Sequence, residues 1–536
     1  MEEVTDRIAA GETAAQIVEK AKAEGTGYKA SVEQMYYGNQ QFLFVYEQFD
    51  DVRLVAAPPS SIGKFGGDTD NWIWPRHTGD FSMFRVYASK DNRPAAYSPQ
   101  NVPYRPKKHF SISTKGVKEG DFTMIYGFPG NTQEYILSDA VAYIAERSDP
   151  AKIAVRTGRL DIITKAQESD PALRIHYAAK HASIANAWKK WQGEALGIDR
   201  RGTVAAKFDY ETQFGLWSVG RPEYAGVVMG LRAEYDRIMD AYFAYEITRE
   251  TLSTLPAAYT PEERSEECFA RRKFAEQALW RHAFREYGRC PKVYRTPSYA
   301  EGMARYKSPE AYADALFEAV WEGSDSVAMQ PAVRLREETK RMLDHISWML
   351  GTKSLRNLNS KILNELYTTY IKGLREWDRE RAFYPDANLT LRVAYGSVAG
   401  YEYADGEYHK PQTTLDGIIA KDNPEIYDYD IPQSLRDLYA SKNYGRWGTV
   451  IDGRRTVPVC FLATNHTTGG NSGSPVLNAG GELIGINFDR TWRSTMSDIA
   501  FDPAICRNIA VDIRYVLFVV DRVGGAGYLL KEMTLK

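Results

Sequence analysis

Residues 467–477 read TTGGNSGSPVL, and they join two stretches that have the composition of β-strands. The stretch before them, TVPVCFLAT (456–464), is apolar and β-branched. The stretch after them, SPVLNAGGELIGINF (474–488), contains two such runs separated by the turn-forming segment NAGGE. Gly470 and Gly473 flank Ser472, and glycine allows the tight turn that would expose the serine hydroxyl. We therefore predict strands on both sides of a tight loop that presents Ser472.

Strand-like sequence of the same kind occupies both ends of the chain, whereas the middle has helical character. Near the N-terminus, runs rich in β-branched and aromatic residues lie at 42–49, 52–57, 81–88, 109–113 and 122–128. Near the C-terminus, further strands are predicted at 389–398 and 509–523. From about 131 to 383, apolar residues recur with the helical period, for example at 233–252, 266–288 and 335–350.

The most economical arrangement of these segments is an α+β chain in which a helical block is inserted between two β-regions. We predict a partial first β-barrel at residues 1–132, an all-α domain at 133–388, and a second β-barrel carrying Ser472 at 389–536. The chain begins with a predicted helix over residues 5–24. It shows no basic segment followed by an apolar one, so no signal peptide is predicted for this chain.

Composition excludes several classes of function. The 536 residues are 43% hydrophobic and 26% charged, which is typical of globular proteins. The net charge of −2 gives no electrostatic reason to expect nucleic-acid binding. There is no apolar run of the length that spans a membrane. The four cysteines form no CxxC pair, although Cys460 and Cys506 could pair with each other, and nothing calls for a metal or organic cofactor.

The loop around Ser472 resembles the nucleophile loop of chymotrypsin-like serine peptidases, which have two β-barrels. In such a loop the amides of Gly470 and Ser472 could stabilise the oxyanion of acyl transfer. A serine nucleophile also needs a base and a carboxylate that orients the base. Of the upstream acidic residues we favour Asp80, because it stands directly before the apolar run at 81–88. The alternative is a glycine-rich turn without catalysis.

A longer pattern is more specific. The segment GKFGGDTDNWIWPRHTGDF (63–81), the motif GNSGSP (470–475) and the helical insertion together resemble the bacterial dipeptidyl-peptidase 7 and 11 family of serine exopeptidases. The resemblance implies that Asp80 and Ser472 are two members of a catalytic triad. It also implies that the N-terminal end of a peptide substrate is held by Asn71, Trp72, Asn186 and Asp489, with Asp489 contacting the free ammonium. The residues alone leave open core packing for Trp72, a solvent-facing helix position for Asn186 and a local ion pair between Asp489 and Arg490.

Arg490 carries the prediction of specificity. It lies 18 residues after Ser472, at the end of the predicted strand LIGINFD (483–489). A guanidinium offers a fixed fork of donors that matches a carboxylate. In the resembled family an Arg at this place marks the dipeptidyl-peptidase 11 type, which prefers Asp or Glu before the scissile bond. The alternative is that Arg490 pairs with Asp489 or points to solvent.

The triad histidine of the resembled family has no counterpart in this sequence. His77 is only three residues before Asp80, and His466 reads as a polar residue at a strand end. We therefore expect a chain that lacks the upstream part of the first barrel and is inactive as given. The alternative is a pseudo-peptidase that binds peptides without cleaving them. A trypsin-like endopeptidase is a weaker third hypothesis, because a helical insertion suits short substrates or chain ends.

The resemblance also sets expectations for partners and location. It implies peptide substrates with a free N-terminus and a periplasmic or cell-surface location. Whether the protein forms a homodimer is left open.

Overall fold

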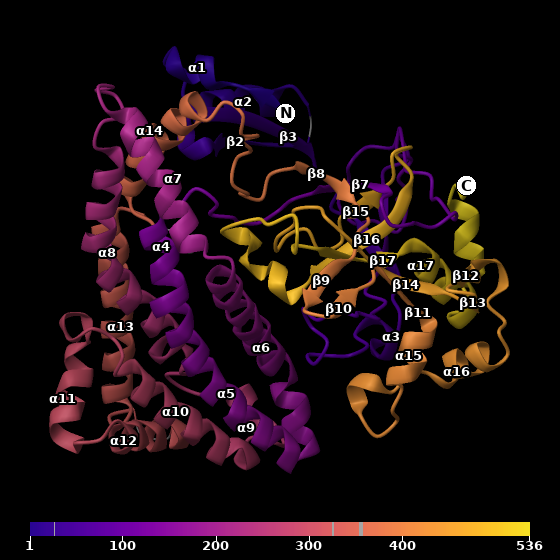
Figure 1. The fold of residues 1–536 in the computed structure, drawn as a ribbon. Coiled ribbons are helices and arrows are strands. Elements are labelled where there is room, and N and C mark those ends of the chain that lie inside the picture. The colour runs from indigo at the N-terminus through magenta and orange to yellow at the C-terminus, as the bar shows by residue number, and fades with distance from the viewer. Residues whose placement is uncertain (26, 324–325, 353–356) are drawn as a thin grey trace. The chain divides into compact units, whose positions relative to one another are not determined.

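The computed structural model describes residues 1–25, 27–323, 326–352 and 357–536, which form two compact units (Figure 1). One unit consists of Met1–Tyr135 together with Ala382–Lys536, and the other of Ile136–Arg381. The first unit contains most of the strands and the second is helical. The chain is therefore α+β, and the two units are described separately below.

A seven-stranded antiparallel sheet forms the centre of the first unit, with the strand order β11-β14-β17-β16-β15-β7-β8. Its strands are β7 (Phe122–Gly127), β8 (Arg392–Ser397), β11 (Gln412–Thr414), β14 (Pro458–Ala463), β15 (Pro475–Leu477), β16 (Leu483–Arg490) and β17 (Asn508–Asp512). Because β7 precedes the helical unit and β8 follows it, the sheet needs both segments of the chain. β11 and β8 are the outer strands, yet an isolated bridge between Val398 and Ala463 brings the end of β8 next to β14.

Side chains on alternate positions of this sheet enter two different cores. In β17, Ala510 packs with Ile125 and Phe461 in one core, whereas Ile509 and Val511 belong to the other. The second core is completed by helices that follow or precede the strands: α15 (Leu415–Lys421), α16 (Gln433–Ala440) and α17 (Ile513–Phe518). Each sheet face is thus buried by apolar side chains, which fixes the register of the strands.

Smaller strand groups complete the first unit. β1 (Glu2–Glu3), β2 (Tyr28–Met35) and β3 (Gln40–Glu47) form one sheet, and β4 (Val52–Ala56), β5 (Met83–Ala88) and β6 (Val102–Pro103) form another. Two-stranded pairs are formed by β9 (Tyr401–Ala404) with β10 (Glu407–His409) and by β12 (Thr449–Ile451) with β13 (Arg454–Thr456). A short helix, α3 (Ser60–Gly63), precedes β5.

Two sequence predictions in this unit were wrong in detail, and the pairing of two cysteines, which the sequence left open, is not formed. The helix predicted over 5–24 is two helices, α1 (Thr5–Ala9) and α2 (Ala14–Ala23), because Gly11 adopts a φ of +99° and Thr13 caps the second helix. The predicted strand 109–113 forms only isolated bridges at Ile112. Cys460 and Cys506 are free thiols.

The predicted strand 509–523 is also wrong over most of its length. β17 ends at Asp512, whose carboxylate accepts a hydrogen bond from the Arg514 amide and so caps α17. The helix continues as a π-helical turn at Val519–Val523. Every side chain of α17 is buried, and all but Arg514 are apolar or aromatic, so its sequence shows no helical period to recognise.

The second unit is built from eleven helices in the residues described for it. They are α4 (Ser138–Tyr143), α5 (Asp149–Ser169), α6 (Pro171–Arg200), α7 (Thr203–Ser218), α8 (Val227–Glu250), α9 (Pro261–Ser265), α10 (Lys273–Tyr287), α11 (Pro297–Tyr306), α12 (Pro309–Glu322), α13 (Gln330–Leu350) and α14 (Lys361–Trp377). α5 and α6 run side by side and share a core with α10 (Figure 1). Within the described chain, no helix combines the length and apolar character needed to cross a membrane.

Candidate active site

The loop between β14 and β15 presents Ser472 to solvent. Gly470 and Gly473 have φ values of +106° and +83°, which side chains with a Cβ rarely adopt. At Gly470 a Cβ would also clash with the Phe128 carbonyl oxygen and lie 2.9 Å from the Gly130 amide nitrogen. The backbone of this loop therefore requires glycine at position 470 for two independent reasons.

Two amides of this loop are available to a ligand. Asn471 donates its amide to the Thr468 carbonyl at 3.0 Å, and Gly473 donates to the Asn487 carbonyl at 2.8 Å. In contrast, the amides of Gly470 and Ser472 donate no hydrogen bond to any described residue. Two unpaired N–H groups beside an exposed serine hydroxyl are what an oxyanion hole requires.

Asp489 connects this region to the segment at 63–81. Its carboxylate accepts hydrogen bonds from Arg76 Nη1 at 2.6 Å and from the Trp72 amide at 3.2 Å. The Arg490 amide donates to the other carboxylate oxygen at 2.8 Å. The Arg76–Asp489 ion pair is nearly buried, with both side chains 8% exposed. Asp489 thus pairs with Arg76, whereas the Arg490 side chain pairs with Asp498.

Asp80 lies in the same electrostatic environment. Its side chain reaches solvent, yet surrounding protein raises the pKa of its carboxyl above the usual value. Arg76 opposes this rise and the Asp489 charge adds to it. Ser472 Oγ donates to the Phe488 carbonyl at 3.4 Å, and the Arg76 guanidinium lies 5.2 Å from the Phe488 ring. Asp80 and Ser472 make no direct contact with each other in the described chain.

Arg490 is buried, being 4% exposed, and its guanidinium is held from several directions. It forms a two-pronged ion pair with Asp498, at 2.7 and 2.8 Å. Nη1 also donates to Ser497 Oγ and to the Thr467 carbonyl. The guanidinium lies 5.6 Å from the centre of the Trp72 ring. Arg490 therefore points neither to solvent nor to the Asp489 side chain, and sequence reasoning missed Asp498.

No histidine of the described chain contacts Ser472 or Asp80. His466 Nε2 instead donates to the Ser497 carbonyl at 3.0 Å, and the ring stacks on Phe501 with the ring centres 4.6 Å apart. Burial lowers the pKa of His466 to about 4, so the ring is neutral at pH 7. His77 is buried as well, and burial lowers its pKa to about 3. Neither ring is placed to take a proton from Ser472.

The remaining predicted residues lie in both units. Asn71 and Trp72 are half-buried in the first unit, and Trp72 has a strained φ of +65°. Asn186 is an exposed residue of α6 in the helical unit. Whether Asn186 approaches Trp72 stays a prediction.

One described group has the residue types of a metal site. His176, Glu266 and Cys268 place one ligand atom each within 4.8 Å of one another in the helical unit. However, Arg272 Nη1 lies 2.7 Å from His176 Nε2 and 3.4 Å from Glu266. A guanidinium in this position opposes a cation, so we interpret the group as an ion-pair cluster.

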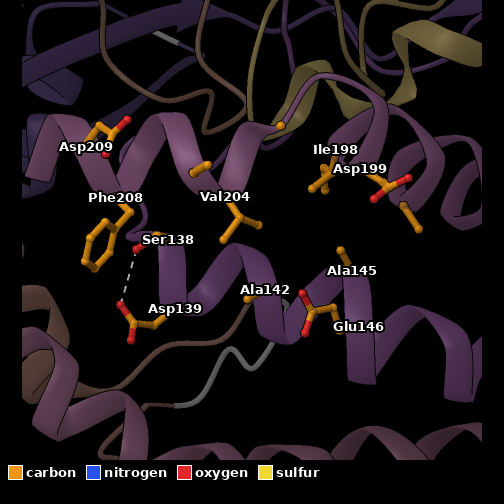
Figure 2. A pocket seen from close by; sticks show the side chains of 13 residues that line it. Ser138, Asp139, Ala142, Ala145, Glu146, Ile198, Asp199, Val204, Phe208 and Asp209 are labelled. Atoms are coloured by element: carbon orange, nitrogen blue, oxygen red, sulfur yellow. Dashed lines mark hydrogen bonds between the residues drawn. The ribbon is translucent and has the colours of Figure 1, made fainter.

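The helical unit also contains a pocket of about 720 Å³ between α4, α6 and α7 (Figure 2). Figure 2 shows apolar side chains such as Val204 and Phe208 together with carboxylates from Asp139, Glu146, Asp199 and Asp209. Ser138, the hydroxyl in this pocket, donates to the Glu211 carboxylate at 2.8 Å. No histidine lies among the lining residues, so the serine–histidine chemistry proposed for Ser472 is not repeated in this pocket.

Comparison with known proteins shows which peptidase family this chain is similar to. The sequence pattern of the family described as peptidase S46 matches residues 2–268 and 262–535. An Asp/Glu-specific dipeptidyl-peptidase from Capnocytophaga gingivalis is 42% identical over 97% of this chain and 78% of its own length. A dipeptidyl-peptidase 7 from Phocaeicola vulgatus is 35% identical over 95% of this chain and 76% of its own.

A solved structure agrees with these sequence relatives. The crystal structure of Porphyromonas endodontalis DPP11 in complex with the dipeptide Arg-Glu matches with a TM-score of 0.84 and 32% identity. The match covers 100% of this chain and 84% of that one. The resemblance read from residues 63–81 and 470–475 is thereby confirmed.

Proposed function

The chain belongs to the peptidase S46 family, and we propose that it is a serine dipeptidyl-peptidase that prefers Asp or Glu before the scissile bond. The proposed specificity rests on the position of the Arg490 side chain. It is a buried guanidinium that touches the first residue of the nucleophile loop, Thr467, and lies beside Trp72. A carboxylate side chain is the ligand that best matches such a group.

The proposed reaction is acyl transfer through Ser472. A base takes the hydroxyl proton while Ser472 Oγ attacks the carbonyl carbon of the second substrate residue. The Gly470 and Ser472 amides stabilise the oxygen that becomes negative. The intermediate collapses as the leaving amine receives the proton, and water then hydrolyses the dipeptidyl ester by the same steps. Asp80 is proposed to orient the base.

The substrate N-terminus is proposed to lie against Asn71, Trp72, Asn186 and Asp489. Asp489 already pairs with Arg76 at 2.6 Å, so a substrate ammonium would join this ion pair rather than meet a lone carboxylate. The near approach of β8 to β14 at Val398 supports the second barrel of the predicted two-barrel fold. The family resemblance supports a periplasmic or cell-surface location, and dimerisation is left open.

A second candidate function is peptide binding without cleavage. The observation that favours it is the lack of any contact from a described histidine to Ser472 or Asp80. Loss of one triad member costs roughly 10⁴- to 10⁶-fold in rate, so we propose that the chain as given turns over little peptide. A dipeptide reporter ending in Glu tests this proposal: binding with no turnover above that of Ser472→Ala supports it, whereas turnover that Ser472→Ala abolishes shows a competent peptidase and refutes the proposed inactivity.

Specificity can be measured by binding, which does not need the base. We expect dipeptides ending in Asp or Glu to bind more tightly than those ending in Leu or Phe by isothermal titration calorimetry. Arg490→Gly should remove this preference, which we estimate at roughly 30- to 5,000-fold because a desolvated charge pair is lost. N-terminal acetylation of the dipeptide should weaken its binding to the unsubstituted chain and to the Arg490→Gly variant.

The matched control is Arg493→Gly, because Arg493 lies in the 3₁₀ helix that follows β16 and its guanidinium stacks on Tyr403 at 4.0 Å. That variant should keep the acidic preference. An unchanged preference in Arg490→Gly would place the specificity pocket elsewhere.

A further inference from the structure

Three buried asparagines form a chain of hydrogen bonds beneath the nucleophile loop. Asn471, Asn487 and Asn508 are each no more than 3% exposed. Asn508 Nδ2 donates to Asn487 Oδ1 at 3.0 Å, and Asn487 Nδ2 donates to the Asn471 carbonyl at 3.1 Å. Asn471 in turn uses its side-chain oxygen to accept from the Thr468 amide at 3.0 Å.

The direction of these bonds follows from the last acceptor. The Asn471 main-chain carbonyl can only accept, so the Asn487 amide must present its nitrogen to it. The oxygen of the Asn487 amide then faces Asn508, which must donate. Asn508 therefore fixes the orientation of Asn487, and Asn487 fixes the carbonyl of Asn471.

That carbonyl belongs to the same peptide plane as the Ser472 amide. In a trans peptide the C=O and the following N–H point in opposite directions. The Asn471 carbonyl is held on the buried side by Asn487 Nδ2 and by the Ser474 amide at 3.0 Å. The Ser472 N–H consequently points away from the core, to the side where no described residue accepts from it.

The second oxyanion amide is oriented in the same manner. The Gly469 carbonyl accepts from the Gly130 amide at 2.6 Å, which turns the Gly470 N–H to the opposite side. The Gly130 amide is a main-chain group, so a substitution cannot remove the hydrogen bond that holds the Gly469 carbonyl. The Asn471 carbonyl, in contrast, is held partly by the Asn487 side chain, which a substitution can remove.

We propose that Asn487, oriented by Asn508, is a positioning residue that aims the Ser472 amide at the developing oxyanion. This inference rests on the proposed function of the same loop. Asn487 does not touch the substrate; it acts by preventing rotation of the 471–472 peptide plane. The inference assigns a role to two residues that the sequence motif around Ser472 does not include.

The test uses two ligands that differ at one group. The dipeptide Arg-Glu, as a product, has a C-terminal carboxylate that can accept from the Gly470 and Ser472 amides. Its C-terminal amide, Arg-Glu-NH₂, presents no negative oxygen there. We expect the unsubstituted chain to bind the acid more tightly than the amide. Calorimetry gives the ratio of the Kd of the amide to the Kd of the acid, and this measurement needs no turnover.

Asn487→Ala should reduce this ratio by roughly 10-fold, since removal of one oxyanion donor commonly costs at least that much. Asn508→Ala should reduce it in the same direction by about 3-fold, because Asn487 then keeps its donor but loses its orientation. A role in folding alone would weaken acid and amide equally and leave the ratio unchanged.

Asn465→Ala is the matched control. Asn465 is another asparagine with 2% exposure; it lies two residues before Thr467, and its side chain bonds Thr123 and the Ala394 carbonyl rather than residues 467–477 in the described contacts. It should lower thermal stability and keep the ratio of the unsubstituted chain. If Asn487→Ala fails to fold, the ratio in Asn508→Ala decides.

An unchanged ratio in a folded Asn487→Ala or Asn508→Ala variant would overturn the positioning role while leaving the proposed function intact. If the unsubstituted chain binds neither ligand, the proposed function fails, and the positioning role fails with it.

Discussion

At the scale of single residues, the contact between Arg490 and Asp498 determines how the proposed specificity works. Asp498 already neutralises the guanidinium, with its own side chain 14% exposed. A substrate carboxylate must therefore approach a charge pair rather than a lone cation. Asp498 is therefore expected to lower the affinity of the proposed site for acidic ligands. It also stabilises the buried Arg490 guanidinium when no ligand is bound.

We predict that Asp498→Asn destabilises the chain and strengthens binding of acidic dipeptides. Removing one partner of a buried ion pair leaves an uncompensated charge, which costs about 3 kcal/mol. A ligand carboxylate recovers part of that free energy when it binds, so the Kd for Arg-Glu should fall by roughly 10-fold. Thermal denaturation and calorimetry measure the two effects. Arg-Leu is the control ligand and should show no gain; weaker binding of Arg-Glu to a folded variant would refute the idea.

His466 gives a prediction about pH at the same scale. Its pKa is about 4 in the folded chain because burial disfavours the charged ring, against 6.5 for the ordinary side chain. Asp498 and the Ser497 carbonyl oppose the shift, Arg490 adds to it, and Glu134 lies 3.6 Å from Nδ1. The unfolded chain therefore binds a proton more readily than the folded chain between these two pH values.

The free energy of unfolding contributed by His466 is accordingly complete above pH 6.5 and is lost as the pH falls toward 4. The loss should reach roughly 3 kcal/mol. We expect His466→Gln to flatten the pH dependence of stability over this range by that amount, measured as urea midpoints from pH 4.5 to 7.5. His77, whose pKa is also lowered, contributes equally to both curves and cancels in their difference. Parallel curves would contradict the prediction.

At the scale of elements, the turn around Ser472 depends more on Gly470 than on the neighbouring Gly469. We predict that Gly470→Ala lowers the melting temperature and abolishes the preference for the acid form of Arg-Glu, because both the φ of +106° and the Phe128 carbonyl oppose a Cβ. Backbone strain of this kind costs about 1–3 kcal/mol before any clash. Gly469→Ala is the control, since a Cβ there meets nothing within 4 Å. Equal effects of the two substitutions would show that the turn tolerates other conformations.

Elements that alternate or repeat in sequence could be predicted, and elements decided by their surroundings could not. The strands around residues 467–477 and the helices α8 and α13 follow directly from residue patterns. The run at 513–523 was misread because complete burial removes the periodic signal. In the candidate site, the motif predicts Ser472 and the family resemblance predicts Arg490, whereas nothing in the sequence indicates Asp498, Asn487 or Asn508. Their roles depend on partners that the fold brings together, and a single Asp or Asn in sequence carries no mark of such a partner.

At the scale of the whole molecule, the two units differ in how the chain builds them. The helical unit is one continuous segment with its own buried side chains, among them Leu160, Ile163, Leu173 and Tyr177. The strand-rich unit needs two separated segments, because β7 pairs with both β15 and β8. Folding of the strand-rich unit therefore requires that its two segments, which flank the helical insertion in the sequence, pair with each other.

The ends of those two halves are already close together. The Tyr135 hydroxyl donates to the Tyr384 carbonyl at 2.5 Å, and the Tyr135 and Phe383 rings stack with their centres 6.2 Å apart. The helical unit is thus an insertion at a point where the chain of the first unit nearly touches itself. A few flexible residues are enough to bridge such a gap.

We therefore predict that residues 136–381 can be exchanged for a linker of about four Gly and Ser residues without unfolding the first unit. The shortened chain should show β-rich circular dichroism and a cooperative melt, and residues 136–381 alone should show a helical spectrum and a melt of their own. Residues 1–135 without 382–536 are the control, and they should not melt cooperatively, because β7 then lacks both of its neighbours. If the shortened chain is unfolded while that control folds, the sheet does not assemble in the way that its pairings indicate. Because the shortened chain keeps Ser472, Arg490 and Asp498 but lacks Asn186, its affinity for Arg-Glu also tests the proposal that Asn186 takes part in binding: unchanged affinity would contradict it.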